Sequence, residues 1–458
     1  MSLVFDDTIA AIATAIGEAG LAVIRISGPQ ALAVADRVFV PAGKHSTNPS
    51  ASSSHTLQYG KIVRREQPVD EVMLSVMRAP RTFTREDVVE ITCHGGVLPT
   101  KLVLDAVLEN GARLALPGEF TRRAFLNGRI DLAQAEAVAD LISARTELAL
   151  SAANEQLAGK LSLQINRLRD ELLTTLAHLE AHIDFPDEDI APDTMEQLIA
   201  RLERGVEFMD ELLRTANEGQ ILRRGIRAAI VGRPNVGKSS LLNQLLGHER
   251  AIVSPLPGTT RDTIEETANI RGLPVVFIDT AGLREPEDVI EREGVRRSRD
   301  TLAKAELILH VFDASEPLSP ADETHLKEFA GRKRIIVRNK SDLTSALQLP
   351  DLGLPIVELS CLTGNGLEAV KDAIKKMVWA GEIHSEMLQV MINSRHQEAL
   401  NRARASTILS IKALHLNAAL EIVAMDLRIA VNAVGEIVGK TSTEDLLDSI
   451  FSQFCLGK

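Results

Sequence analysis

The octapeptide Gly232-Arg-Pro-Asn-Val-Gly-Lys-Ser239 constrains this chain most, because it fits the phosphate-binding pattern G-x-x-x-x-G-K-[ST]. Its two glycines let the backbone curl so that successive N–H groups point at one centre. Lys238 can then reach the β- and γ-phosphates, and the Ser239 hydroxyl can hold Mg²⁺. Residues 227–231 before the loop read as a buried strand, and residues 240–246 after it as a helix. The sequence therefore predicts a nucleotide-binding α/β domain.

Further segments follow this loop in the order that a GTP-binding domain needs. Pro257-Gly-Thr-Thr-Arg-Asp262 contains threonines, one of which can complete Mg²⁺ coordination when a γ-phosphate is present. A predicted strand then ends in Asp279-Thr-Ala-Gly282, a D-x-x-G motif. Its aspartate can hold Mg²⁺ through water, and its glycine N–H can sense the γ-phosphate. These segments predict a loop pair that responds to the state of the nucleotide.

Base recognition is expected from Asn339-Lys-Ser-Asp342, an N-K-x-D motif at the end of another predicted strand. The Asp342 carboxylate can accept hydrogen bonds from N1–H and the 2-amino group of guanine. Adenine lacks this donor pair, so the motif favours GTP over ATP. Residues 360–362 can supply a backbone N–H to guanine O6. The residues predicted to bind GTP are Asn235, Val236, Gly237, Lys238, Ser239, Ser240, Ser254, Thr259, Thr260, Asp279, Thr280, Ala281, Gly282, Asn339, Lys340, Asp342, Ser360, Cys361 and Leu362.

The expected catalytic machinery departs from a common GTPase pattern, because Leu283 stands where many GTPases carry a water-orienting Gln. Carboxylates of the same loop are candidates for that role: Glu285, Glu287, Asp288, Glu291 and Glu293. A positive charge must also stabilise the transition state, which changes the rate roughly 10³–10⁵-fold. Either an arginine or a monovalent cation can supply it. The side-chain carbonyl of Asn235, together with backbone carbonyls of residues 254–259, could cage such a cation.

Composition limits the class of protein. The 458 residues suggest about two to four domains. A net charge of −12 restricts nucleic-acid binding to a local basic patch, and 3% aromatic residues argue against a base-stacking platform. Three cysteines far apart in sequence favour a reducing compartment, here the cytoplasm. The N-terminus lacks the basic region of a signal peptide, and no apolar stretch approaches the ~20 residues of a membrane span.

Periodicity along the chain predicts a multidomain fold that combines α+β, all-α and α/β parts. Mixed strands and helices come first, and the serine-rich residues 46–54 within them predict a mobile loop. Helical patterns lie on both sides of an α/β segment, which favours a P-loop GTPase domain inserted into one discontinuous helical domain. Two independent helical domains are the alternative. The expected domains are residues 1–120 (α+β), 121–220 (helical, first part), 221–378 (GTPase) and 379–458 (helical, second part).

Motifs outside the α/β segment carry a resemblance that covers the chain from end to end. They are Arg25-Ile-Ser-Gly28, Phe83-Thr84, Glu86-Asp87, His94-Gly-Gly96, Pro117-Gly-Glu-Phe-Thr-Arg-Arg-Ala-Phe-Leu-Asn127, Asp131-Leu-Ala-Gln-Ala-Glu136, Asp184-Phe-Pro186 and Phe454-Cys-Leu-Gly-Lys458. Together with the nucleotide motifs, they resemble the MnmE (TrmE) family of tRNA-modification GTPases, within the TrmE-Era-EngA-like GTPases. One departure is Glu18, where relatives tend to carry a basic residue.

The resemblance implies a K⁺-stimulated GTPase whose GTPase domains dimerise across the nucleotide. Carried over by position, the K⁺ ligands would be Asn235, Ser254, Leu256 and Thr259, and the Mg²⁺ ligands Ser239 and Thr260. Glu291 would orient water, and the catalytic residues would be Glu291, Lys238 and Cys455. For Cys455, a packed or frayed terminal position is the alternative. The N-terminal domain would form a homodimer and bind 5-formyl-tetrahydrofolate or a related folate through Arg25, Glu90, Arg129 and Lys458.

The resemblance also implies a partner, the flavin- and NADH-using protein MnmG, in a heterotetramer. Together the two would add an aminomethyl or carboxymethylaminomethyl group to C5 of the wobble uridine of certain tRNAs. A factor of the Era or EngA type, in which GTP switches binding to RNA or the ribosome, is the alternative. That function predicts a basic KH-like module after the GTPase domain, whereas residues 380–458 are helical and not strongly basic.

Overall fold

The structure, a computed structural model, describes residues 6–43, 47–184, 195–247, 266–278, 303–379, 388 and 390–458. The chain divides into two compact units. The first comprises Met1–Ala139, Leu157–Gly205 and Arg402–Lys458, and the second comprises Asp140–Gln156 and Val206–Asn401. Within the part of the chain that the structure describes, no helix is both long and apolar enough to cross a membrane.

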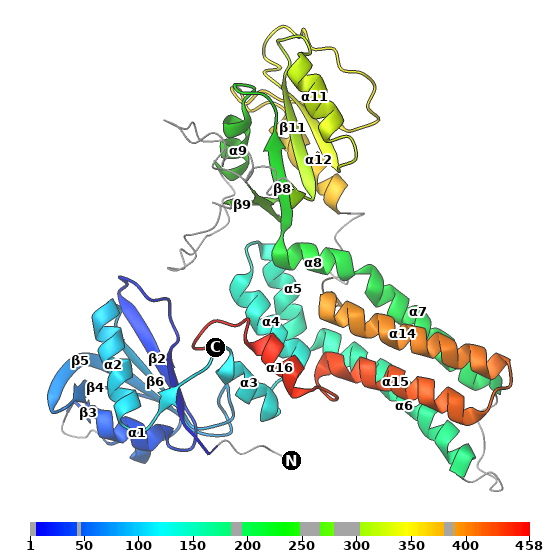
Figure 1. The fold of residues 1–458 in the computed structure, drawn as a ribbon. Helices are drawn as coiled ribbons and strands as arrows, with labels where there is room; N and C mark the ends of the chain where they lie inside the picture. Colours follow the sequence, from blue (N-terminus) through cyan, green and yellow to red (C-terminus); the bar gives the residue numbers. More distant parts are fainter. Residues whose placement is uncertain are drawn as a thin grey trace. The chain divides into compact units, whose positions relative to one another are not determined.

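The first unit begins with a seven-stranded sheet in the order β3-β4-β5-β6-β2-β1-β7 (Figure 1). Neighbouring strands are antiparallel, except that β1 and β7 run parallel. The strands are β1 (Ile9–Ile12), β2 (Leu21–Ser27), β3 (Phe39–Pro41), β4 (Thr56–Arg64), β5 (Gln67–Met77), β6 (Val88–His94) and β7 (Arg113–Leu114). Alternate residues of β2, such as Ile24 and Ile26, are fully buried. They share one core with helices α1 (Ala31–Val38) and α2 (Val97–Glu109).

Helices complete the first unit, and they come from distant parts of the sequence. Helix α6 (Lys160–Asp184) packs along α15 (Leu420–Val438), as Figure 1 shows. Helix α16 (Glu444–Phe451) packs on α3 (Glu119–Leu126). Further described helices are α4 (Leu132–Ser143), α7 (Met195–Arg214) and α14 (Ser394–His415). The packing of α6 on α15 agrees with the prediction of one discontinuous helical domain.

The second unit contains a six-stranded sheet in the order β13-β12-β11-β8-β10-β9. Among its described strands, β9 and β10 pair antiparallel and the other neighbours pair parallel. The strands are β8 (Ile226–Val231), β9 (Glu266–Ile270), β10 (Leu273–Phe277), β11 (Leu307–Asp313), β12 (Arg334–Asn339) and β13 (Ile356–Glu358). The predicted strand at 227–231 is confirmed by β8, which lies inside the sheet. The helix that follows this strand, α9 (Lys238–Gly247), confirms the predicted helix at 240–246.

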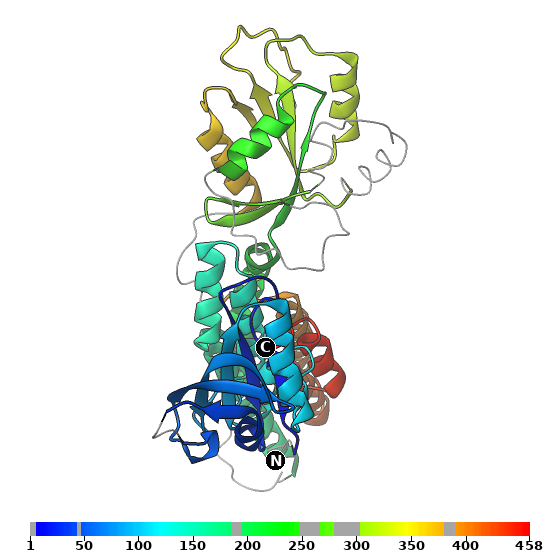
Figure 2. The ribbon, with the colours of Figure 1, turned by 90° about the vertical axis from the view of Figure 1, so that its left-hand side faces the viewer.

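Helices cover both faces of this second sheet (Figure 2). Residues Ala228 and Ile230 of β8 pack in one core with α9 and α12 (Leu367–Val378). Ala229 and Val231 point to the opposite face, where Phe329 follows helix α11 (Pro320–Glu328). This strand therefore alternates between two buried faces, as expected for a central parallel strand. The α/β fold class predicted for this part of the chain is confirmed.

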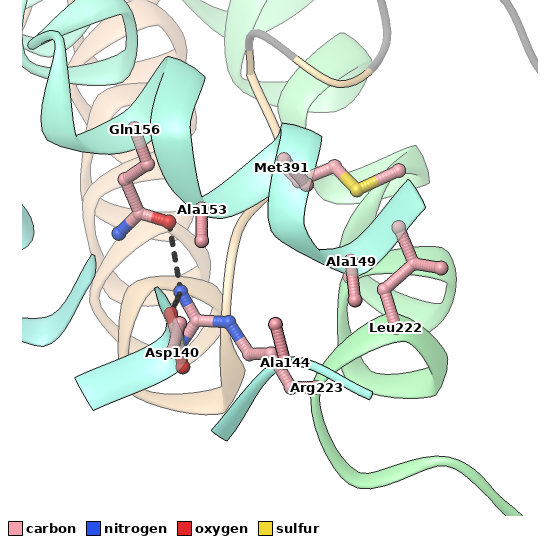
Figure 3. Close-up of a pocket in the computed structure, with 10 residues that line it drawn as sticks. Asp140, Ala144, Ala149, Ala153, Gln156, Leu222, Arg223 and Met391 are labelled. Atoms are coloured by element: carbon pink, nitrogen blue, oxygen red, sulfur yellow. Dashed lines mark hydrogen bonds and ion pairs between the residues drawn. The ribbon is translucent and has the colours of Figure 1, made fainter. Parts of the chain in front are cut away.

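Helix α8 (Ala216–Arg224) leads into β8 and is held by a polar contact on Arg223. One terminal guanidinium nitrogen, Nη2, lies 2.7 Å from Asp140 Oδ2 and donates to Gln156 Oε1 at 2.8 Å. Figure 3 shows these partners around a small cavity whose walls include Ala149, Ala153, Leu222 and Met391. Arg223 thereby ties the helix that precedes the phosphate loop to α4 and to α5 (Glu147–Leu157).

Candidate functional site

The phosphate loop lies between β8 and α9, in the left-handed backbone conformations that its sequence requires. Gly232 has φ 146°, Asn235 has φ 64° and Gly237 has φ 99°. Lys238 folds back over the loop, where its Nζ donates to the carbonyls of Gly232 at 2.9 Å and Arg233 at 2.7 Å. Burial lowers the pKa of the Lys238 ammonium. The loop is thus closed around a cation that a phosphate group can engage.

The side chain of Asn339 joins the base loop to the phosphate loop. Its Nδ2 donates to the carbonyl of Val236 at 2.8 Å, and its Oδ1 accepts from the N–H of Cys361 at 3.0 Å. Asn339 is buried, and a Cβ added at Gly237 would come within 2.1 Å of its Nδ2. Three sequence-predicted segments are therefore brought together by one amide.

Asp342 lies exposed beside this junction, with one carboxylate oxygen held by a hydrogen bond from Ser360 Oγ at 2.5 Å. Because the Cys361 N–H already serves Asn339, the exposed Leu362 supplies the other candidate N–H for guanine O6. The carbonyl of Cys361 accepts from Gln244 Nε2 at 2.7 Å. Sequence reasoning missed Gln244, because nothing in the sequence of α9 indicates a contact 117 residues away.

Several predicted site residues lie outside the described residues, and their roles stay predictions. They are Ser254, Leu256, Thr259, Thr260, Asp279, Thr280, Ala281, Gly282 and Glu291, with the alternative carboxylates Glu285, Glu287, Asp288 and Glu293. Of the predicted metal ligands, Asn235 and Ser239 are described, and both are exposed. Ser240 is exposed as well, in the first turn of α9.

A second candidate site lies on the first sheet. Arg25 and Glu90 stand opposite each other on β2 and β6, and Arg25 Nε donates to Glu90 Oε1 at 2.8 Å. The guanidinium carbon of Arg25 also lies 5.7 Å from the centre of the Phe120 ring. Two of the residues predicted to bind folate are therefore in direct contact, beside an aromatic face.

The C-terminal tail reaches the same phenylalanine. The N–H of Phe120 donates to the carbonyl of Lys458 at 3.2 Å, and the N–H of Gly118 donates to the carbonyl of Cys455 at 3.4 Å. Gly457 fits closely here, since a Cβ at this residue would lie 2.3 Å from the carbonyl oxygen of Ile12. The Cys455 side chain itself is exposed.

Arg129 joins this region through a second aromatic ring. Its guanidinium carbon lies 6.0 Å from the centre of the Phe83 ring, and Phe83 packs against the cluster that contains Phe120. The four residues predicted from the resemblance thus gather around two phenylalanines. The sequence motifs contain Phe83 and Phe120, but their role as aromatic faces depends on packing that no local pattern reveals.

Two family models together match almost the whole chain. Residues 8–129 match the model described as GTP-binding protein TrmE N-terminus, and residues 132–455 match the MnmE helical domain. The chain belongs to the MnmE family. The tRNA modification GTPase MnmE of Bacillus subtilis (strain 168) is 46% identical, over 99% of this chain and 100% of that protein. That of Geobacillus thermodenitrificans (strain NG80-2) is 48% identical, over 99% of each.

Among solved structures, the G domain of the T. maritima FeoB iron transporter is 27% identical, with a TM-score of 0.26. It covers 33% of this chain and 98% of its own length. As a member of the MnmE family the chain is a GTPase, and the prediction of a GTP hydrolase is confirmed.

Proposed function

We propose that this GTPase is stimulated by K⁺ and modifies C5 of the wobble uridine of certain tRNAs together with an MnmG-type flavoprotein. The group added is aminomethyl or carboxymethylaminomethyl, and a formyl-tetrahydrofolate-type folate donates the carbon. The observation that carries the proposal is that Arg25, paired with Glu90, lies over Phe120, whose N–H donates to the main-chain carbonyl of Lys458, in a chain that also holds a GTP-type phosphate loop. The name of its relatives, tRNA modification GTPase, supports tRNA as the substrate.

The nucleotide chemistry of the proposal uses the phosphate loop and the two segments after it. Ser239 and Thr260 hold Mg²⁺, and Glu291 orients the attacking water. Asn235 holds K⁺ with Ser254, Leu256 and Thr259, in the place of an arginine finger. One observation favours the cation: Arg233, the arginine of the phosphate loop, is bound to Asp322 and Glu316 instead.

The folate chemistry follows from the types of side chain that meet on the first sheet. The glutamate carboxylates of a folate suit Arg25 or Arg129, and the donor edge of a pterin suits Glu90. The flat pterin can stack on an aromatic ring, and the half-buried Phe83 offers one, whereas Phe120 is fully buried beneath Arg25. Cys455 stays a candidate for the modification chemistry, since its exposed thiol lies in the tail that meets Phe120.

We propose the remaining organisation on the family relationship. Residues 1–120 form the folate-binding domain and a homodimer, 121–220 and 379–458 form the helical domain, and 221–378 form the GTPase domain. GTP hydrolysis drives cycles of GTPase-domain dimerisation within a heterotetramer with the flavoprotein. The cytoplasm is the proposed location, where tRNA is available.

The test is reconstitution with the flavoprotein partner, NADH, a folate donor and unmodified tRNA, read by mass spectrometry of the wobble nucleoside. The proposal expects a modified uridine that requires GTP, K⁺ and the folate. The proposal would be contradicted if GTP were hydrolysed under all these conditions while the wobble uridine of the tRNA stayed unmodified. GTP-dependent binding to ribosomal RNA in that case would identify an assembly factor of the Era or EngA type.

A further inference from the structure

The side chain of Arg233 leaves the phosphate loop and binds two carboxylates beyond β11. Its Nε lies 2.9 Å from both oxygens of Asp322, and its Nη2 donates to Glu316 Oε2 at 3.0 Å. The Asp322 side chain is 1% exposed and that of Glu316 is 56% exposed. An ion pair with a buried carboxylate holds its geometry better than an exposed one, so Asp322 is the principal anchor.

Asp322 is itself fixed by the N-terminus of helix α11. Its Oδ2 accepts hydrogen bonds from the N–H of Ser319 at 3.0 Å and from Ser319 Oγ at 2.8 Å. The N–H of Asp322 donates back to Ser319 Oγ at 3.2 Å, which completes a capping box. Both the main-chain N–H and the hydroxyl of Ser319 therefore help to orient the carboxylate that binds Arg233.

The anchored residue also holds the phosphate-binding lysine. The carbonyl of Arg233 accepts from Lys238 Nζ, while the Arg233 guanidinium is bound to Asp322. Because Arg233 makes both contacts, a shift of α11 would also shift the loop that Lys238 closes. At the other end of the same connection, Asp313 Oδ2 lies 2.5 Å from Lys340 Nζ in the base loop. Residues 313–322 thus contact both the phosphate loop and the base loop.

We propose that the Asp322–Arg233 pair holds the phosphate loop in its binding conformation, which makes Asp322 a positioning residue that does not touch the nucleotide. The inference rests on the GTP site proposed above. Asn235 is a non-glycine residue with φ 64°, a conformation that persists only where the surrounding structure holds it. Without the pair, only a fraction of molecules would hold the loop ready, and apparent affinity falls by that fraction. Bound nucleotide restores the loop, so kcat is preserved.

The experiment uses the full chain and four variants: Asp322→Ala, Arg233→Ala, the double variant, and Ser319→Ala as the matched control. Ser319→Ala removes the hydroxyl bonds of the capping box but keeps the main-chain N–H bond to Asp322 Oδ2, which still orients the carboxylate toward Arg233. Steady-state GTP turnover gives KM and kcat, a fluorescent GDP analogue gives affinity, and thermal unfolding gives Tm. We expect affinity to fall about tenfold in each single pair variant, with kcat within about twofold of wild type. The double variant should lose no more affinity for the GDP analogue than either single variant does, because both substitutions break the same pair.

The control and one further variant separate the possible failures. Ser319→Ala should lower Tm and keep wild-type GDP affinity. A purely structural role predicts instead that Asp322→Ala loses kcat with unchanged KM, or that the two single losses add; either result overturns the inference. If Lys238→Ala loses nucleotide while Asp322→Ala binds normally, only the positioning inference fails. If Lys238→Ala binds GDP as tightly as wild type, the proposed nucleotide site itself fails.

Discussion

The side-chain amide of Asn339 donates to the backbone carbonyl of Val236 at 2.8 Å, so the base loop and the phosphate loop share a buried hydrogen bond. The same side chain accepts from the N–H of Cys361. A buried amide left without these partners would cost about 1–3 kcal/mol. Recognition of the base and of the phosphates is therefore mechanically coupled, and a change in one loop is expected to disturb the other.

Gly237→Ala tests this coupling. The new Cβ would lie 2.1 Å from Asn339 Nδ2, so the Asn339 side chain must move and lose its hydrogen bond to the carbonyl of Val236. The φ of 99° at this residue adds backbone strain to any side chain. Strain and the lost hydrogen bond together cost about 2–4 kcal/mol, which weakens GDP binding on the order of 100-fold. Fluorescent-GDP titration measures this. Gly247→Ala is the control, because a Cβ there meets nothing within 4 Å; equal affinities of the two variants would contradict the coupling.

The buried His310 is expected to make the second unit less stable in acid. Burial, with the nearby Arg334 and His325, lowers the pKa of this imidazole to about 3, so the folded chain keeps it neutral when the unfolded chain takes a proton. Its contribution is intact above pH 6.5 and is lost as pH falls toward 3, at about 1.4 kcal/mol per pH unit. Urea unfolding at pH 7.5 and 5.5 should show a smaller loss of stability in His310→Leu. Parallel losses in both proteins would refute this assignment.

The three cysteines predict a selective labelling pattern. Cys455 is exposed, whereas burial raises the pKa of the Cys93 thiol and raises that of Cys361 to about 11. Since the thiolate is the reactive form, a maleimide at pH 7 should modify Cys455 first. Peptide mass spectrometry identifies the site, and Cys455→Ser should stay unmodified over the same time. Faster labelling of Cys361 would show that its loop opens readily.

Arg25→Ala should weaken folate binding and leave GTP hydrolysis unchanged. It removes the partner of Glu90 and the cation over Phe120, and leaves a carboxylate unpaired beside the proposed pterin position. Loss of one partner of a charged pair in a binding site costs about 2–5 kcal/mol, so we expect at least about 30-fold weaker binding. Calorimetric titration with 5-formyl-tetrahydrofolate measures it, with the exposed Lys61→Ala as control. Equal affinities in all three proteins would remove Arg25 from the site.

Sequence patterns predicted best the elements whose signal lies within a few neighbouring residues. The phosphate loop and its flanking strand and helix follow from residues 226–247 alone. The strands β1 and β7 have four and two residues, too few for a periodic signal. They form only because β2 provides a partner for β1, and β1 in turn for β7.

Contacts between distant residues escaped prediction. Serine-rich composition predicts a mobile loop at 46–54, yet Arg78 donates to the carbonyls of Ser50 and Ser52 and secures part of it. Arg233 and Asp322, which form an ion pair, are 89 residues apart in the sequence. Lys458, at the end of the sequence, meets Phe120 of the N-terminal part of the chain. A carboxylate or an aromatic ring carries no local sign of the partner that folding brings to it.

GTP turnover in KCl and in NaCl at matched ionic strength tests whether K⁺ takes the place of an arginine finger in this GTPase. The measurement should cover several protein concentrations, in wild type and Asn235→Gly. Glycine accepts the φ of 64° at this residue and removes only the side-chain oxygen. K⁺ should stimulate wild-type turnover strongly, the stimulation should rise with protein concentration, and it should disappear in Asn235→Gly. Equal wild-type rates in both salts would contradict this role of K⁺.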